Sequence, residues 1–189
     1  MRVFVFLHSC YADWEIGYLL PEIIENHHSV VTFGLDTAPV KSLGNLTVTP
    51  DRNLSDVKLD EIDVLILPGG DFWEKCHSSE LHGLVVACYK RQIPIGAICG
   101  ATTYLARLGL LNDISHTSNN VGYLEKIDNY KGQKFYIKKP AVCERNIITA
   151  GGFGSVEFTY EILKKLKIYS DEDCEVWYRA FKYCEDPSK

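Results

Sequence analysis

The chain alternates short apolar runs with longer segments in which apolar residues recur at helical spacing. The short runs contain many β-branched and aromatic residues and few polar ones, a pattern typical of parallel strands that are buried on both faces of a sheet. We expect four such strands, at residues Arg2–Leu7, Val30–Leu35, Val64–Leu67 and Ile93–Ile98.

The longer segments have the apolar face of amphipathic helices. Pro21 lies inside the first of them, so we expect that helix to kink or break. Ser78 or Ser79 is placed to cap the second helix through its side-chain oxygen. The predicted helices cover residues 13–27, 78–91, 100–111 and 156–166, followed by a last amphipathic helix with Trp177, Tyr178 and Phe181.

Two segments have the pattern of antiparallel pairs. Residues 40–49 contain Leu43-Gly44-Asn45-Leu46 between alternating positions, which favours a hairpin. Later in the chain, Phe135–Ile137 and Ala141–Cys143 are expected to pair with Ile147–Thr149. Because strands alternate with helices elsewhere, the sequence predicts right-handed crossovers and a mainly parallel α/β sheet with helices on both faces, formed by a single domain, residues 1–189.

Composition narrows the class of protein. The 189 residues are 46% hydrophobic and 24% charged, with a formal net charge of −5, which argues against a nucleic-acid partner or an anionic membrane surface. The seven cysteines are scattered and odd in number, so reduced thiols in a cytoplasmic protein are expected rather than a disulfide framework. The apolar run after Met1 is short for a signal peptide, and no run reaches membrane-spanning length.

Cys99 is the candidate nucleophile. It follows a predicted strand and precedes a predicted helix, so its side chain is expected at a sharp turn on the carboxyl edge of the sheet. The positive end of the helix dipole favours a thiolate there. The residues around it are small, with Ala97 and Ala101 at the positions that glycines hold in a G-x-S-x-G elbow.

Ligands of doubly wound sheets bind outside the carboxyl ends of the strands, and this rule gathers distant residues at one edge. Glu15 follows the first strand, Gly69-Gly70 follow the Val64 strand, and Gly151-Gly152 follow the last strand. We expect these groups to share one crevice with Cys99. Its walls would include the loops 71–77 and 119–134.

The predicted chemistry is addition of the Cys99 thiolate to an electrophilic carbonyl. The amides of Gly70 and Gly100 are candidates to stabilise the oxyanion. Glu15 would act as a general acid or base, or as a hydrogen-bond donor to the thiolate. His116 is the histidine best placed by sequence to act as a base.

Each of these residues also has a structural interpretation. Cys99 is a type of residue that is often buried as packing, and Glu15 suits the first turn of a helix. His116 would equally serve as a hydrogen-bonded core or surface residue. Cys76, His77 and His82 lie close in sequence, but they lack the spacing of a known metal site, so we expect no metal and no cofactor.

These motifs resemble the DJ-1/PfpI branch of the class I glutamine amidotransferase-like superfamily. The resemblance rests on Asp13-Trp14-Glu15, Leu67-Pro68-Gly69-Gly70, Ala97-Ile98-Cys99-Gly100-Ala101, His116 and Thr149-Ala150-Gly151-Gly152. It implies a flavodoxin-like three-layer sandwich, a homodimer, Cys99 as the reactive cysteine, Glu15 as its carboxyl partner and His116 as the nearby histidine. Members of the family are described as peptidases or amidases, deglycases, cofactor-free glyoxalases, chaperones and oxidative-stress sensors.

Two departures narrow the expected activity. Peptidase-like members have a histidine directly after the nucleophile, whereas Gly100 follows Cys99, so a PfpI-type protease is not expected. Glutaminases take a His-x-Glu pair from late in the chain, and no histidine follows His116. We therefore expect a cysteine-dependent hydrolase or lyase that acts on a small carbonyl or amide substrate. The alternative is a stress-response protein whose cysteine oxidises to a sulfinate without turnover.

Overall fold

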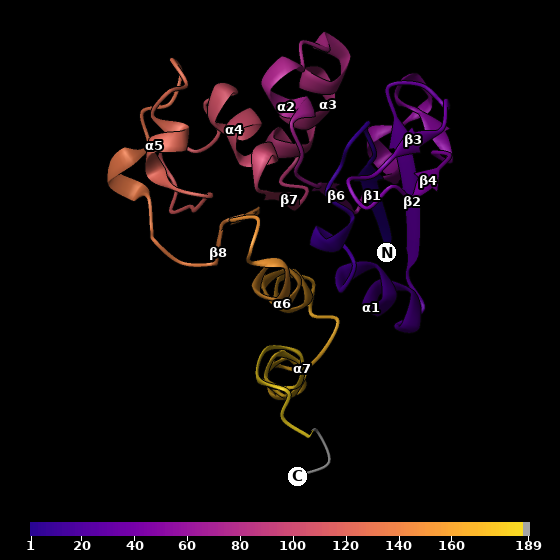
Figure 1. Ribbon diagram of the computed structural model, residues 1–189, viewed down its shortest axis with the longest axis vertical. Coiled ribbons are helices and arrows are strands. Elements are labelled where there is room, and N and C mark those ends of the chain that lie inside the picture. The colour runs from indigo at the N-terminus through magenta and orange to yellow at the C-terminus, as the bar shows by residue number, and fades with distance from the viewer. Residues whose placement is uncertain (187–189) are drawn as a thin grey trace.

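The computed structural model describes residues 1–186 and contains a seven-stranded sheet with helices on both faces (Figure 1). Neighbouring strands are parallel except for the last pair, β9 and β8. The expected flavodoxin-like, doubly wound, three-layer sandwich is confirmed. In spatial order the strands are β5 (Arg52–Asn53), β2 (Ser29–Gly34), β1 (Arg2–Phe6), β6 (Val64–Leu67), β7 (Ile95–Ile98), β9 (Ile147–Ala150) and β8 (Ala141–Glu144).

Alternate residues of the central strands pack against two helical layers. Val3 and Val5 belong to the apolar cluster under α1 (Leu19–Glu25) and α6 (Ser155–Leu166). Phe4 and Phe6 belong to the cluster on the opposite face. Because both faces are covered, the strands carry apolar residues at successive positions. The helices of the second face are α2 (Phe72–Lys75), α3 (Ser79–Lys90) and α4 (Gly100–Arg107), with α5 (Val121–Leu124) beside α4 (Figure 1).

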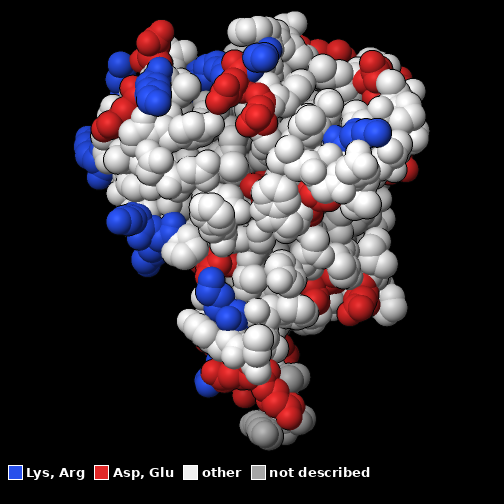
Figure 2. Space-filling model, in the orientation of Figure 1, with Lys and Arg blue, Asp and Glu red and all other residues white. Residues whose placement is uncertain are grey.

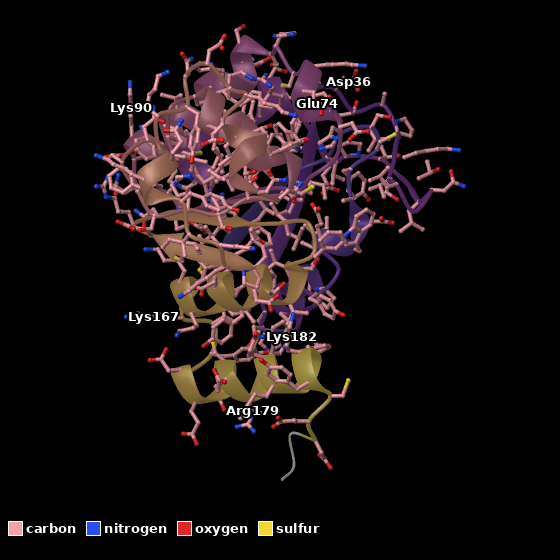
Figure 3. All side chains as sticks on the ribbon, turned by 60° about the vertical axis from the view of Figure 1, so that its left-hand side comes forward. Asp36, Glu74, Lys90, Lys167, Arg179 and Lys182 are labelled. Carbon is pink, nitrogen blue, oxygen red and sulfur yellow. The ribbon has the colours of Figure 1, made fainter. Side chains whose placement is uncertain are left out.

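The last helix, α7 (Asp171–Tyr183), packs against the outside of α6 rather than on the sheet. Glu22 of α1 anchors this end of the chain by accepting hydrogen bonds from Trp177 Nε1 at 2.7 Å and from the Tyr169 hydroxyl at 2.6 Å. Figure 3 shows Lys182 between the two helices, where it pairs with Glu157 of α6 at 2.7 Å.

The register of the parallel strands places their carboxyl ends at one edge. Leu67 of β6 lies opposite Ala97 of β7, and Ile98 lies opposite Ala150 of β9. The loops that begin at Pro68, Cys99 and Gly151 therefore leave the sheet side by side.

The structure corrects the first predicted helix. Residues 13–27 form a short 3-10 helix, Asp13–Glu15, and then α1, so the break precedes Pro21. Pro21 is the third residue of α1. The N–H groups of the first turn have no acceptor within the helix, so a proline there costs no helical hydrogen bond. The predicted helices at 78–91, 156–166 and the C-terminal end are confirmed as α3, α6 and α7, whereas the helix after Cys99 ends at Arg107, before Gly109 with its φ of 73°.

The late strands are only partly as expected. The hairpin at residues 40–49 is confirmed, with β3 (Val40–Lys41) antiparallel to β4 (Thr47–Val48). Ala141–Glu144 pairs with β9 as expected, but Phe135–Ile137 does not join the sheet. Both edges of β9 are already occupied, by β7 and β8. The segment forms a 3-10 helix, Gln133–Phe135, and then a bridge between Tyr136 and His116.

In Figure 2 charged side chains are scattered mainly over the edges of the face, and its middle is mostly uncharged, with a few acidic atoms visible. Of the helices within residues 1–186, none is long and apolar enough to cross a membrane.

Candidate active site

Cys99 lies between β7 and α4 in a backbone conformation that few non-glycine residues adopt. Its φ is 55° and its ψ is −120°, and such strain costs roughly 1–3 kcal/mol. The Cys99 N–H donates to Ala150 O at 2.9 Å, and Thr102 Oγ1 donates to Cys99 O at 2.6 Å. These bonds hold the partly exposed thiol at the N-terminus of α4.

Two glycines allow the loop after β6 to approach this turn closely. A Cβ at Gly100 would lie 2.5 Å from Gly70 O, and a Cβ at Gly69 would lie 2.6 Å from both Cys99 Cβ and Glu15 Oε2. Real Cβ atoms do not approach other atoms so closely. The small residues of both motifs are therefore required by the contact between the two loops.

Glu15 is fully buried and lies beside Cys99, as the edge rule predicts. Its Oε2 accepts a hydrogen bond from the Gly69 N–H at 2.6 Å. Its Oε1 is buried and has no hydrogen-bond partner among the described residues. A Cβ at Gly152 would be 3.2 Å from Glu15 Oε1 and 3.1 Å from Cys99 Sγ, so both atoms border the same backbone position.

Asn119 is a further contact of the thiol that our sequence analysis placed only within a wall loop. Its Nδ2 donates to Cys99 Sγ at 3.3 Å, while its Oδ1 accepts from the Gly152 N–H at 2.8 Å. The second bond orients the amide so that its donor end faces sulfur. Trp14 Nε1 in turn donates to Gly152 O at 3.3 Å and fixes the same loop from the other side.

Among the glycine amides predicted near the thiol, three are already engaged. Gly69 N–H donates to Glu15, Gly151 N–H to Pro140 O and Gly152 N–H to Asn119. The amides of Gly70 and Gly100 donate to no oxygen of the described residues, and the Gly100 N–H faces the Cys99 sulfur. These two amides remain available to a reacting group.

His116 is not brought to the thiol. Its ring is fully buried, with Nδ1 donating to Ile114 O at 2.8 Å and Nε2 accepting from the Tyr130 hydroxyl at 2.7 Å. Burial lowers the pKa of His116, which favours this neutral form. Both nitrogens are occupied, so the ring suits the structural interpretation better than that of a base for Cys99.

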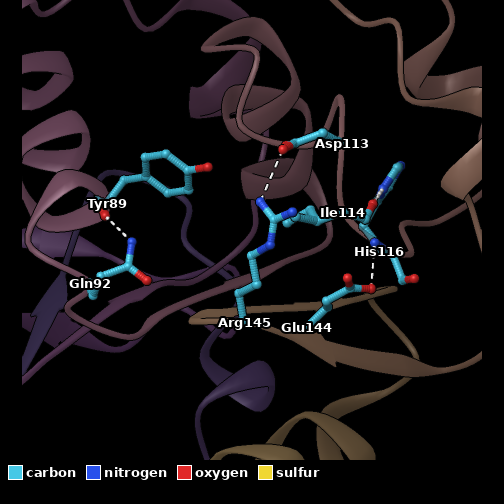
Figure 4. Close-up of polar contacts among 8 residues, drawn as sticks. Tyr89, Gln92, Asp113, Ile114, His116, Glu144 and Arg145 are labelled. Atoms are coloured by element: carbon cyan, nitrogen blue, oxygen red, sulfur yellow. Dashed lines mark hydrogen bonds and ion pairs between the residues drawn. The ribbon is translucent and has the colours of Figure 1, made fainter.

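The segment that carries His116 is also tied to the sheet. Ser115 N–H donates to Glu144 Oε2 of β8 at 2.8 Å, and Arg145 pairs with Asp113 at 3.0 Å (Figure 4). Thr117 N–H donates to Thr149 Oγ1 of β9 at 2.9 Å. His116 thus helps to fix the segment that leads to Asn119.

Comparison with known proteins identifies the family. The model of the DJ-1/PfpI family matches residues 1–165. The chain belongs to the DJ-1/PfpI family. It is 36% identical to the uncharacterized protease YoaZ of Bacillus subtilis, over 96% of this chain and 90% of YoaZ. A crystal structure of a DJ-1 superfamily protein from Agrobacterium tumefaciens has a TM-score of 0.89 and 34% identity, and covers 97% of this chain and 98% of its own.

Relatives within the DJ-1/PfpI family have names of different activities. The glutathione-independent glyoxalase DJR-1.2 of Caenorhabditis elegans is 30% identical over 73% of both chains. Other relatives are named proteases or deglycases. These names suggest a hydrolase-like enzyme and do not single out one substrate.

The electrostatics of the DJ-1/PfpI site couple the thiol to the carboxyl group. Burial raises the pKa of Glu15 to about 7. Hydrogen bonds from the Gly69 N–H and from Cys99 lower this pKa, but their effect is smaller than that of burial. Burial and the nearby Glu15 charge raise the pKa of Cys99, whereas the Asn119 amide and the Gly100 N–H lower it. The Glu15 charge therefore opposes ionisation of Cys99, whereas the hydrogen bond from Cys99 favours ionisation of Glu15, so the two protonation equilibria are coupled.

No group of three or more His, Cys, Asp or Glu side chains within residues 1–186 could hold a metal ion. The groups at this edge that can take part in a reaction are the Cys99 thiol, the Glu15 carboxyl group and the backbone amides.

Replacing Asn119 by Ala removes a donor to the sulfur, so we expect the pKa of Cys99 to rise. Alkylation of Cys99 by iodoacetamide at neutral pH should slow by about tenfold, the order expected for one hydrogen bond to a charged group. Peptide mass spectrometry would follow Cys99 separately from the other thiols. Asn120→Ala is the matched control, because Asn120 caps α5 and does not contact Cys99. Equal rates in the two variants would contradict the assignment.

The raised pKa of Glu15 predicts a pH-dependent stability. The folded state binds its proton up to about pH 7, whereas the unfolded state loses it near 4.5. This contribution to the free energy of unfolding is complete below the unfolded pKa and is lost as pH rises to about 7, by roughly 3 kcal/mol. The free energies of unfolding of the wild type and Glu15→Gln can be measured in urea between pH 4.5 and 7. The difference between the two proteins should change by roughly 3 kcal/mol over this pH range. A constant difference would refute the shift.

Proposed function

We propose that this protein is a cysteine-dependent enzyme that acts on a small carbonyl or amide substrate through Cys99. The observation that carries the proposal is the pairing of a partly exposed thiol with a fully buried carboxyl group whose pKa is about 7. In its carboxylate form, Glu15 can take the proton from sulfur, which leaves a thiolate beside a neutral acid without placing two negative charges together.

The first chemical step would be addition. The thiolate forms a bond to the carbonyl carbon, and the π electrons of the C=O bond move to oxygen. The free amides of Gly70 and Gly100 would donate to that oxygen, which is the task predicted for them from sequence. Gly70 lies in the loop after β6, and Gly100 is the first residue of α4.

Glu15 would then return the proton. With an amide substrate, the proton goes to the departing nitrogen as the C–N bond breaks, and a thioester with Cys99 remains. The Glu15 carboxylate next takes a proton from water, whose oxygen attacks the thioester and releases the acid and the thiol. With an aldehyde or ketone, the proton goes to the oxygen of the adduct. The relatives named glyoxalase and deglycase support substrates of this second kind.

The test is a screen of small 2-oxoaldehydes, glycated amines and primary amides with the wild type and Cys99→Ala. We expect one of these substrate classes to be turned over, and Cys99→Ala to lose more than about a thousandfold in rate. Cys143→Ala, which removes a partly buried thiol of β8, is the matched control. If Cys99→Ala still turns over the substrate, and if it is as stable to heat as Cys143→Ala, Cys99 is excluded as the nucleophile.

A redox sensor is the second candidate function, and the donors around the sulfur favour it. Two molecules of peroxide would each transfer one oxygen to the thiolate and leave as water, giving a sulfinate. Asn119 Nδ2, the Gly100 N–H and protonated Glu15 are placed to donate to its oxygens. Mild peroxide should add the mass of two oxygens at Cys99 before it modifies exposed Cys10 or Cys184. Oxidation without this selectivity would exclude the sensor.

A homodimer and a cytoplasmic location also remain predictions. Light scattering after size-exclusion chromatography tests the first, and fractionation of the source cells tests the second.

A further inference from the structure

A second cavity lies away from Cys99, between the start of α3 and the C-terminal part of α4. Its volume is about 360 Å³, within the range of small-molecule sites. The residues that line it include Cys76, His77 and His82, the group that the sequence places together without a metal-site spacing. Since these three do not form a metal cluster, the cavity requires another explanation.

The cavity is rich in hydrogen-bond donors and contains a fixed positive charge. None of the residues that line it is acidic, and one of them is Arg107. Two of the guanidinium N–H groups donate to Cys76 O at 2.9 Å and to Trp73 O at 2.8 Å, which holds the cation in place. Arginine has five N–H donors, so others remain for a ligand.

The N-terminus of α3 contributes to the same cavity. Ser78 and Ser79 line it at the start of this twelve-residue helix. Ser78 Oγ accepts from the Leu81 N–H at 3.2 Å, which leaves its own hydroxyl hydrogen free to donate. The first backbone N–H groups of a helix have no partner within it and attract anions. Glu80 of the first turn is exposed and does not line the cavity.

Tyr104 supplies an independent observation. Its side chain is 3% exposed, and its buried hydroxyl has no hydrogen-bond partner. The hydroxyl interacts electrostatically with Cys76 and Arg107, two residues that line the cavity together with Tyr104. A buried hydroxyl without a partner destabilises the folded state, because it loses its hydrogen bonds to water. A ligand oxygen would relieve this cost.

We propose that this cavity binds a small molecule through a phosphoryl group, held by Arg107, the Tyr104 hydroxyl, the serine hydroxyls and the N-terminus of α3. These donors come from α3, from α4 and from the loop before α3, so they approach a ligand from several directions. This arrangement suits a phosphoryl group, which has three terminal oxygens, better than a planar carboxylate, which has two. His77 and His82, both exposed, lie where the remainder of the ligand would extend.

The site shares α4 with the catalytic turn. Gly100 begins this helix at Cys99, and Arg107 ends it at the cavity. Trp73 connects the two places, because its ring borders Gly100 while its carbonyl accepts from Arg107. Binding of a phosphorylated ligand is nevertheless independent of the chemistry of Cys99, so each proposal can fail without the other.

The test is titration of the full chain with inorganic phosphate and with glycerol phosphate. Calorimetry measures the binding, and NMR monitors the backbone amide resonances of Ser79 and Glu80. We expect one site, with both resonances shifting and acetate binding more weakly than phosphate. Tyr104→Phe should weaken phosphate binding by about tenfold and should be at least as heat-stable as the wild type without ligand. Arg107→Gln should abolish binding.

Two control variants make the result specific. Tyr160→Phe removes a tyrosine hydroxyl from α6, outside the cavity, and should bind phosphate like the wild type. Cys99→Ala should also bind normally, which separates this site from the catalytic thiol. The proposal is overturned if phosphate up to tens of millimolar gives no binding, if the shifted amides lie elsewhere, or if Tyr104→Phe binds as tightly as Tyr160→Phe.

Discussion

The structure around the thiol depends on the strained backbone of Cys99. A positive φ at a non-glycine residue persists only where its surroundings hold it, and here β9 binds the amide while α4 binds the carbonyl. The turn also sets what its neighbours can be. Gly70 O lies only 2.5 Å from the position that a Cβ of residue 100 would take, so this position of the turn must be glycine. The glycine positions and the exposure of the thiol thus follow from one local geometry.

The buried carboxyl group of Glu15 is the second constraint, and it links stability to function. Its desolvation destabilises the ionised form in the folded protein, while the Gly69 N–H binds one oxygen and the other has no hydrogen-bond partner among the described residues. The same burial that costs stability at neutral pH keeps a proton available beside Cys99. Asn119 and the Gly100 N–H favour the Cys99 thiolate, whereas burial and the Glu15 charge oppose it.

Much of this arrangement could be predicted because it depends on backbone topology. Apolar runs identified the central strands, and the edge rule then placed Glu15, Gly69 and Cys99 together. Asn119 was not identified, because its contact depends on how Gly152 orients a side chain at the end of an irregular segment. The prediction for His116 failed to anticipate its partners for a similar reason: Tyr130 comes from a loop with no periodic pattern. Phe135–Ile137 has a strand-like composition, but β9 had no free edge for it.

The central claim is that burial raises the pKa of Glu15, so that this group can take a proton from the thiol and return it near neutral pH. The most direct test is the pH dependence of the carboxyl-carbon chemical shift of Glu15, measured by NMR in the wild type with Cys99 reduced. The account predicts a titration with a midpoint at about pH 7. A midpoint near 4.5, the value of an ordinary glutamate, would show that burial does not raise the pKa of Glu15, and that the carboxylate is too weak a base to take the thiol proton as the proposed addition requires.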